Sequence, residues 1–172
     1  MTHWKKVLIA ATLANAVIAM VMVQAQQTKP WFLGHLTPRD YIEIQQLVAR
    51  YSYAVDMHGG DGSAYAALFT PDGVFGTQAK GTAQLAELAA KTNKERSGPA
   101  FARHFVTNVM IKPSPEGATG RSYLVALDIS EVRKPTTILH GGHYDDVYVK
   151  TSQGWRIKSR TYVRSEIGPQ PA

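Results

Sequence analysis

Cysteine is absent from all 172 residues, and that absence excludes several kinds of protein. No disulfide can form, and no thiolate is present to bind a metal or to attack a substrate. Lys and Arg outnumber Asp and Glu by 19 to 13, which gives a formal net charge of +6, but they are spread along the chain and form no block. Surfaces that bind nucleic acids are usually marked by clustered positive charge, so we expect no nucleic-acid partner.

The N-terminus has the composition of an export signal. Lys5 and Lys6 precede a long uncharged run, and "VQA" at positions 23–25 offers the small or β-branched residues that a signal peptidase accepts. We predict that residues 1–25 are a signal peptide, that the mature protein is exported to the periplasm or secreted, and that it does not stay inserted in a membrane. The alternative is an uncleaved anchor, because the uncharged run over 7–28 approaches the length of a membrane span.

The residues after the predicted signal are numerous enough for one domain with its own core. Removing the signal leaves 147 residues and lowers the formal charge from +6 to +4, because two lysines are lost. We predict a linker over 26–36, one domain over 37–166 and a short tail over 167–172.

The "TPRD" segment is typical of a helix start. Thr37 stands at the cap, Pro38 at the first helical position and Asp40 three residues after the cap. Apolar residues then recur at intervals of three and four, which predicts a helix to about Met57. Asp56 ends an otherwise uncharged row of this helix, and a carboxylate there is costly unless a partner compensates it.

The remaining pattern predicts two more helices followed by long strands. A short helix over 63–69 ends at the turn signal "TPDG", a strand begins at Val74, and a third helix covers 82–94. Beyond it the period changes to two. Four β segments are predicted, over 102–112, 119–132, 137–150 and 155–166. This order favours an α+β domain in which helices pack on one face of a curved, mostly antiparallel sheet.

His104 in "RHFVTN" is the main candidate for chemistry. Strand alternation places His104, Val106, Asn108 and Met110 on one face. If that face meets Asp56, the carboxylate would orient the imidazole and stabilise its charged form, which makes a general base. A strand histidine is more often an ordinary core residue and a helix-terminal aspartate more often a cap, so spacing alone leaves both interpretations open.

Four segments in series resemble one family: "QQLVARYSYAVDMHGGDGSAYAALFTPDGVF", "RHFVTN", "ATGRSYLVAL" and "GGHYDDVYVKTSQGWRIKSRTYV". From Thr37 to Val163 their order and spacing are similar to those of the SnoaL-like branch of the NTF2-like superfamily. The resemblance implies a cone-shaped α+β barrel, in which a strongly curved sheet wraps around N-terminal helices and leaves a pocket open at one end. It implies no cofactor and no metal.

Within that branch the sequence looks most similar to the dehydratase-like members, which share an aspartate on the first helix and a histidine on a strand. Asp56 and His104 match those positions, and Tyr51 matches a site tyrosine of bile-acid 7α-dehydratase. Scytalone dehydratase has a second active-site histidine on the next strand. Here "YLVALDIS" offers only Asp128, so its particular substrate handling does not carry over.

The hypothesis from the sequence is an exported lyase of the dehydratase type. His104 would abstract a proton from a small cyclic hydroxy compound, Asp56 would orient it, and Tyr51 would donate a hydrogen bond to the developing oxygen charge. Predicted substrate-binding residues are Tyr53, Asn108 and Tyr144. The alternatives are an isomerase with the same pair, or a non-catalytic module that binds a small hydrophobic molecule or dimerises. A homodimer or homotrimer through the sheet is expected.

Two polar segments near the C-terminus invite other interpretations. In "HGGHYDD", His140 and His143 are three residues apart, so on a strand they point to opposite faces, and we predict no metal site there. Gly141 and Gly142 instead predict a bulge or bend. Arg160 belongs to an alternating basic row on the last strand, for which a solvated or subunit-facing position is the default. The alternative is that Arg160 reaches an acidic group of the substrate.

Overall fold

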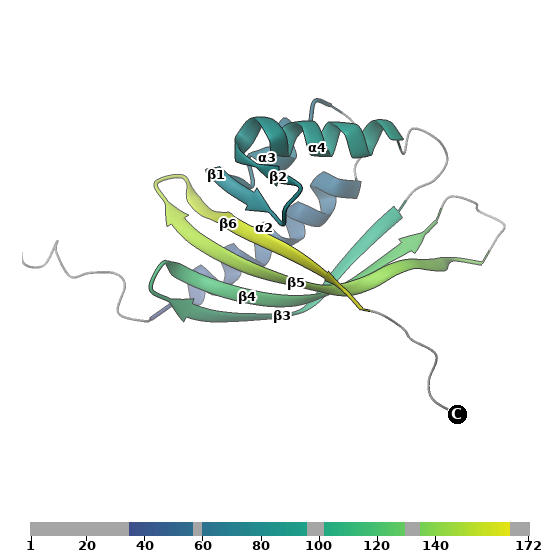
Figure 1. Ribbon diagram of the computed structural model, residues 1–172. Coiled ribbons are helices and arrows are strands. Elements are labelled where there is room, and N and C mark those ends of the chain that lie inside the picture. Colours follow the sequence, from purple (N-terminus) through teal and green to yellow (C-terminus); the bar gives the residue numbers. More distant parts are fainter. Residues whose placement is uncertain (1–34, 57–59, 96–101, 130–134, 166–172) are drawn as a thin grey trace, which may run out of the picture. The chain divides into compact units, whose positions relative to one another are not determined.

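The computed structural model describes residues 35–56, 60–95, 102–129 and 135–165 (Figure 1). The predicted signal peptide, nearly all of the predicted linker and the predicted tail lie outside these residues. Within the described ranges, no helix combines the length and the apolar character that crossing a membrane requires.

Three helices and six strands make up the described part of the chain. Helix α2 covers the predicted first helix as far as Asp56, and the predicted end at Met57 lies outside the described residues. The bounds are α2 Pro38–Asp56, α3 Ser63–Ala66, β1 Phe69–Phe75, β2 Ala79–Lys80, α4 Gly81–Glu95, β3 Ala102–Ser114, β4 Gly117–Asp128, β5 Thr137–Thr151 and β6 Gly154–Arg164.

One curved sheet holds all six strands, in the order β2-β1-β6-β5-β4-β3. Neighbouring strands are antiparallel except for β1 and β6, which are parallel. Helix α2 contacts β3 and β6, and α4 contacts β1 and β2. Figure 1 shows α2 lying along the sheet and α4 lying beside β1 and β2. The predicted α+β architecture, with helices on a mostly antiparallel sheet, is therefore confirmed.

The start of α2 is anchored by its own cap and by the sheet. The Thr37 amide and hydroxyl both donate to Asp40 Oδ2, and the Asp40 amide donates to Thr37 Oγ1. Lys150 Nζ and Trp155 Nε1 donate to Asp40 Oδ1 at 2.6 and 2.9 Å. The capping pattern expected from "TPRD" is present, and the same carboxylate ties the helix start to the β5–β6 hairpin.

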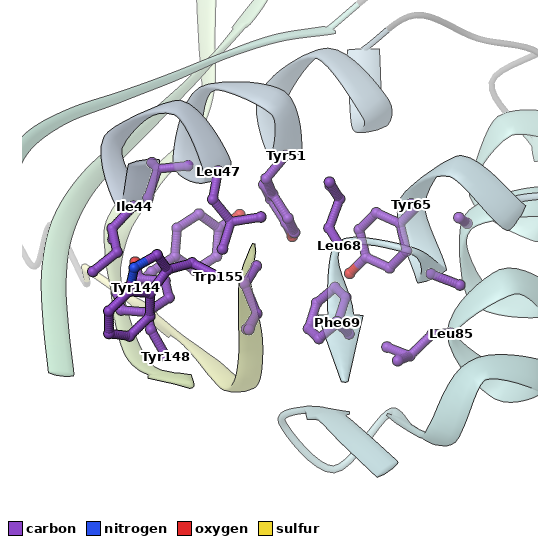
Figure 2. Packing of buried hydrophobic residues seen from close by; sticks show 14 of the residues in the cluster. Ile44, Leu47, Tyr51, Tyr65, Leu68, Phe69, Leu85, Tyr144, Tyr148 and Trp155 are labelled. Carbon is purple, nitrogen blue, oxygen red and sulfur yellow. The ribbon is translucent and has the colours of Figure 1, made fainter. Parts of the chain in front are cut away.

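The hydrophobic core lies between α2 and the sheet and continues beneath α3 and α4. Figure 2 shows Tyr51 projecting from α2 between two groups of side chains. On one side lie Tyr144 and Trp155 from the sheet, and on the other lie Tyr65 and Phe69. A tyrosine at this junction brings a hydroxyl into the middle of the core, where burying a polar group is costly unless that group has hydrogen-bond partners.

The "TPDG" segment was predicted as a turn before a strand at Val74, and this prediction is wrong. Strand β1 begins at Phe69, which pairs with Ile157, and the register then shifts before Val74 pairs with Ser159. The extra residues form a bulge, in which Thr70 Oγ1 donates to Asp72. Turn-forming residues are therefore accommodated inside a strand, because a bulge can absorb them without ending it.

The alternation predicted for β3 fails at Asn108. This residue has φ 52°, and the pairing of β3 with β4 shifts between Thr107 and Met110. Asparagine tolerates the left-handed conformation better than most residues, so it can form such a bulge. After it the faces exchange: Val109 and Ile111 pack against the core, while Met110 is 56% exposed.

One face of the sheet carries exposed apolar side chains. Among them are Phe105 and Tyr123, which are 52% and 56% exposed. The homodimer or homotrimer expected through the sheet stays a prediction.

Candidate functional site

Asp56 and His104 meet where the last residue of α2 lies against the third residue of β3. His104 Nδ1 is 2.5 Å from Asp56 Oδ1, and the His104 backbone amide donates to Asp56 Oδ2 at 2.9 Å. Their side chains are only 5% and 8% exposed. The carboxylate therefore binds one residue through both of its oxygens and is held in a single orientation.

This contact defines the chemistry available to the imidazole. A carboxylate accepts hydrogen bonds, so it selects the His104 form that carries a proton on Nδ1. Nε2 is then the nitrogen that can take a proton, and the carboxylate would stabilise the resulting imidazolium. The arrangement has the geometry of a general base supported by an acidic residue.

His104 forms part of the wall of a cavity of about 270 Å³. Asp56 lies behind the ring and is not itself part of the wall. Helices α2, α3 and α4 and strands β1, β3, β4, β5 and β6 all contribute to the wall. The lining residues are Tyr51, Val55, Tyr65, Phe75, Gln78, Leu88, Ala89, Thr92, His104, Leu124, His140, Tyr144 and Tyr162.

Three tyrosines from three elements gather on one side of this cavity. The ring centroid of Tyr51 lies 5.4 Å from that of Tyr65 and 5.6 Å from that of Tyr144. Burial, and then the interaction with Tyr51, raises the pKa of Tyr65 and the pKa of Tyr144 well above the ordinary value. Both phenols are therefore neutral at physiological pH and retain their hydrogens as donors.

Arg160 lies directly behind two of these rings. Its guanidinium carbon is 4.0 Å from the ring centre of Tyr51 and 4.4 Å from that of Tyr144, and the side chain is fully buried. Two hydrogen bonds of 2.7 Å join it to Asp146. Burial by itself would lower the pKa of Arg160, but the charge and hydrogen bonds of Asp146 raise it instead.

The default expectation for Arg160, a solvated or subunit-facing position, is therefore wrong. Val147 pairs with Ser159 and Tyr148 with Ile157, so Lys158 is an extra residue on β6. This bulge turns Arg160 toward the interior, on the same face as the core residue Ile157.

The three predicted substrate-binding residues have different positions. Tyr144 lines the cavity. Tyr53 is 65% exposed and lines a separate surface groove, because it lies on the side of α2 that does not meet the sheet. Asn108 is exposed in the β3 bulge. The structure thus places neither Tyr53 nor Asn108 at the cavity that contains His104.

His140 is a cavity residue that the sequence did not indicate. His104 pairs with Ala126 on β4, and Ala126 pairs with His140 on β5, so both histidines stand in one row across three strands. The sequence did contain one indication of this position. Alternation along the strand places His140 on the same face as Tyr144, which was predicted to bind substrate. The pairing register that aligns His140 with His104 could not be read from the sequence.

The two histidines of "HGGHYDD", which were considered as metal ligands, have different surroundings in the structure. His140 lines the cavity, whereas His143 Nε2 lies 3.6 Å from Asp145, whose carboxylate binds Arg121 in an exposed pair. Among the residues that the structure describes, no group of three or more His, Asp or Glu side chains is placed to hold a metal ion.

Comparison with known proteins identifies one matching family, described as the SnoaL-like domain, over residues 37–161. No curated protein matches the chain. Among solved structures, a protein of unknown function from Mycobacterium tuberculosis is 28% identical, with a TM-score of 0.66 over 76% of this chain and 79% of that chain.

Two solved structures from Novosphingobium aromaticivorans are also similar. An NTF2-like protein with a cystatin-like fold is 24% identical, with a TM-score of 0.64 over 76% of this chain and 85% of that chain. A protein provisionally described as a scytalone dehydratase is 23% identical, with a TM-score of 0.61 over 74% of this chain and 85% of that chain. These likenesses confirm the predicted fold.

Proposed function

The chain belongs to the SnoaL-like domain family, and from this premise we propose that it is a lyase that removes water from a small cyclic β-hydroxy ketone. The observation that carries the proposal is the buried contact between Asp56 and His104 at the wall of the cavity. A carboxylate that holds an imidazole beside a sheltered space is an arrangement that can abstract a proton from carbon.

In the proposed reaction His104 Nε2 takes a proton from the carbon next to the substrate carbonyl. Asp56 stabilises the imidazolium that forms, and negative charge develops on the carbonyl oxygen. Tyr51 donates a hydrogen bond to that oxygen, with the guanidinium of Arg160 against its ring. Loss of the hydroxyl group from the next carbon completes the elimination.

The size and lining of the cavity support a small cyclic substrate. Its volume of about 270 Å³ is near the lower end for ligand sites, which suits a compound of one or two rings. Leu88, Phe75 and Val55 provide apolar contacts, while the tyrosines and histidines provide polar ones. The likeness to a provisionally described scytalone dehydratase supports the same class of reaction.

The full chain should convert 3-hydroxycyclohexanone to cyclohex-2-enone, which is followed by the ultraviolet absorption of the enone. His104→Gln should lower kcat/KM at least about 10²-fold, because a positioned base contributes on the order of 10² to 10⁴. Tyr51→Phe should lower kcat, since a donor to the developing charge is lost. Tyr53→Phe is the matched control, because this tyrosine lies on the same helix but away from the cavity, and it should not change the rate.

Two results would reject the proposal. The first is a wild-type protein that does not convert the probe, and the second is a His104→Gln variant with unchanged kcat/KM. Thermal unfolding of each variant shows whether a lost rate reflects a lost fold.

A non-catalytic binding module is the second candidate function. It is favoured by the two hydrogen bonds from one residue to Asp56, which would also serve to fasten α2 to β3. In that case Asp56→Asn would lower stability and leave binding of cyclohex-2-enone, measured by calorimetry, nearly unchanged. An isomerase using the same pair would instead move the double bond of an unsaturated ketone without releasing water.

We also propose that residues 1–25 direct export, on the basis of their charge and apolar pattern. The N-terminus of the protein recovered from the exported fraction should be Gln26. Recovery of the uncut chain from membranes would support the anchor instead.

A further inference from the structure

Three tyrosines meet in the wall of the cavity, and Tyr51 stands between the other two. Its ring centroid lies 5.4 Å from that of Tyr65 and 5.6 Å from that of Tyr144. All three residues are at most 4% exposed. Figure 2 shows Tyr51 projecting from α2 toward the group that contains Tyr65. None of the three hydroxyls is among the buried side-chain atoms of the described chain that lack a hydrogen-bond partner.

The hydroxyls of Tyr65 and Tyr144 both form a hydrogen bond with the hydroxyl of Tyr51. Each bond raises the pKa of the outer phenol, which is the effect of a bond that this phenol donates. The Tyr51 oxygen therefore accepts from both neighbours, whose only hydroxyl hydrogens are used in these bonds. Tyr51 keeps its own hydrogen, so it is the member of the group that can donate to a bound molecule.

The guanidinium of Arg160 favours this direction of the two bonds. Its carbon lies closer to the ring of Tyr51 than to that of Tyr144, at 4.0 and 4.4 Å. A positive charge against a ring stabilises electron density on that phenol, which suits the acceptor of the group. An O–H group whose oxygen accepts hydrogen bonds is in turn a stronger donor, by about 10–30% per bond.

The position of Tyr65 depends on the close approach of α3 to α4. Gly62, just before α3, has φ 79°, and a β-carbon added there would lie 2.0 Å from the backbone oxygen of Ala86. Only glycine fits this turn with α4 where it is. The Tyr65 ring also packs on Phe69, with the centroids 5.2 Å apart. The contact between Tyr65 and Tyr51 is therefore supported by the backbone as well as by packing.

We propose that Tyr65 and Tyr144 are positioning residues that direct the Tyr51 hydroxyl into the cavity and strengthen it as the donor to an oxyanion. This inference rests on the proposed function for the source of that oxyanion, the enolate that forms when His104 removes the carbon-bound proton. No proton passes along the three phenols. The Tyr51 hydrogen stays on Tyr51 and bonds more strongly to the substrate oxygen as negative charge develops there.

The proposal also defines a class of ligand, the anion of a small ring enol. A phenolate is a stable compound of this class, because it has one ring and a negative oxygen attached to it. The anion should be preferred over the neutral phenol, since a hydrogen bond to a charged acceptor is stronger than one to a neutral acceptor.

Binding of 4-nitrophenol tests the inference without catalysis. The anion absorbs visible light and the neutral form does not, so a pH titration of the phenol bound to the full chain gives the ratio of the two affinities. The wild type should bind the anion at least about tenfold more tightly. Tyr65→Phe and Tyr144→Phe should each lower that ratio about fivefold, because one bond to the Tyr51 oxygen is lost. The same variants in a His104→Gln background should show the same losses, although the imidazole can no longer titrate.

A double variant distinguishes action through Tyr51 from direct contact with the ligand. Tyr51→Phe should remove the preference for the anion, because the donor to the ligand is gone. Tyr65→Phe added to that variant should then change the ratio less than about twofold. Tyr53→Phe, on the same helix but outside the cavity, is the matched control and should leave the ratio unchanged. Thermal unfolding establishes that each variant is folded.

Kinetics with 3-hydroxycyclohexanone gives a second readout. The extra charge on the substrate oxygen exists only in the transition state, so Tyr65→Phe should lower kcat about fivefold and leave KM nearly unchanged. A purely structural role would lower stability and leave both the kcat of the folded protein and the affinity ratio as they are.

The possible results separate this inference from the proposed function. An unchanged affinity ratio in Tyr65→Phe and Tyr144→Phe would overturn the positioning role, and so would equal losses from Tyr65→Phe with and without the Tyr51 hydroxyl. A wild-type protein that does not bind 4-nitrophenol, or binds both forms equally, would also overturn it. None of these results depends on turnover. Failure to convert 3-hydroxycyclohexanone, with the affinity ratios as expected, would reject the lyase and leave the oxyanion site.

Discussion

Helix α2 carries a buried aspartate at each end, and the two have different surroundings. Asp40, at the start, is 5% exposed, and Asp56, at the end, is 7% exposed. Asp40 accepts from the cap residue Thr37, from Lys150 and from Trp155. Asp56 accepts from the backbone and the ring of His104.

Burial alone therefore does not distinguish a structural carboxylate from one suited to catalysis. The side chains that bind Asp40 are hydrogen-bond donors, and none of them lines the cavity that contains His104. Although burial raises the pKa of Asp40, the hydrogen bonds from Lys150, Thr37 and Trp155 outweigh it and hold that pKa well below the usual range. The partner of Asp56 can gain or lose a proton, and it lines a cavity.

Asp56→Asn should give the largest effect, a fall in kcat of about 10³-fold with 3-hydroxycyclohexanone. The amide oxygen can still accept from the His104 backbone, but the amide nitrogen would then face Nδ1 and favour the form that carries the proton on Nε2. The base is lost while the fold remains. Steady-state kinetics measures kcat, and thermal unfolding measures stability. A large loss of stability with little loss of kcat would show that Asp56, like Asp40, has a structural role.

Asp146 is a third buried carboxylate, and Arg160 donates a hydrogen bond to each of its oxygens. Arg160→Met would leave Asp146 with only Tyr148 as a side-chain donor in the described protein, so an uncompensated charge would be buried. Removing one member of such a pair costs about 3–5 kcal/mol. Urea unfolding should show this loss. Lys158→Met is the control, because Lys158 lies on the same strand as Arg160 and forms an exposed ion pair with Asp72 of β1. This variant should lose less than about 1 kcal/mol of stability.

Asp40→Ala should destabilise the protein by about 2–3 kcal/mol, because a helix cap and the acceptor for Trp155 are lost together. The kcat of the remaining folded protein should not change. Urea unfolding gives the first value and kinetics below the unfolding temperature the second. A fall in kcat comparable to that of Asp56→Asn would show that the two ends of α2 are not independent.

Local signals predicted much of this architecture. The cap at Thr37, the apolar stripe of α2 and the four long strands all depend on neighbouring residues, so the sequence displays them directly. The positions of Asp56 and His104 at the ends of their elements followed from the same signals, and the family resemblance indicated that they meet.

Long-range register accounts for what the sequence did not show. Alternation assumes an uninterrupted strand, and the bulges at Asn108 and Lys158 exchange the faces of β3 and β6. Asn108 therefore lies on the exposed face of β3, away from the cavity, and Arg160 lies in the core, contrary to the alternation. His140 was missed because its partner row through Ala126 depends on pairing across β4, and no local pattern specifies that pairing.

The smallest expected effect is the pH dependence of the stability that the ionised Asp40 side chain contributes. Because the pKa of Asp40 is lower in the folded protein than in the unfolded chain, its ionised form stabilises the fold above about pH 4, the ordinary aspartate pKa. That contribution is lost as the pH falls from there toward the lower folded pKa. Asp40→Asn removes the charge at every pH, so its stability should differ from wild type at pH 7 and converge on it below pH 4. Urea unfolding at several pH values measures the difference, and a gap that stays constant down to pH 2 would mean that the charge of Asp40 does not contribute.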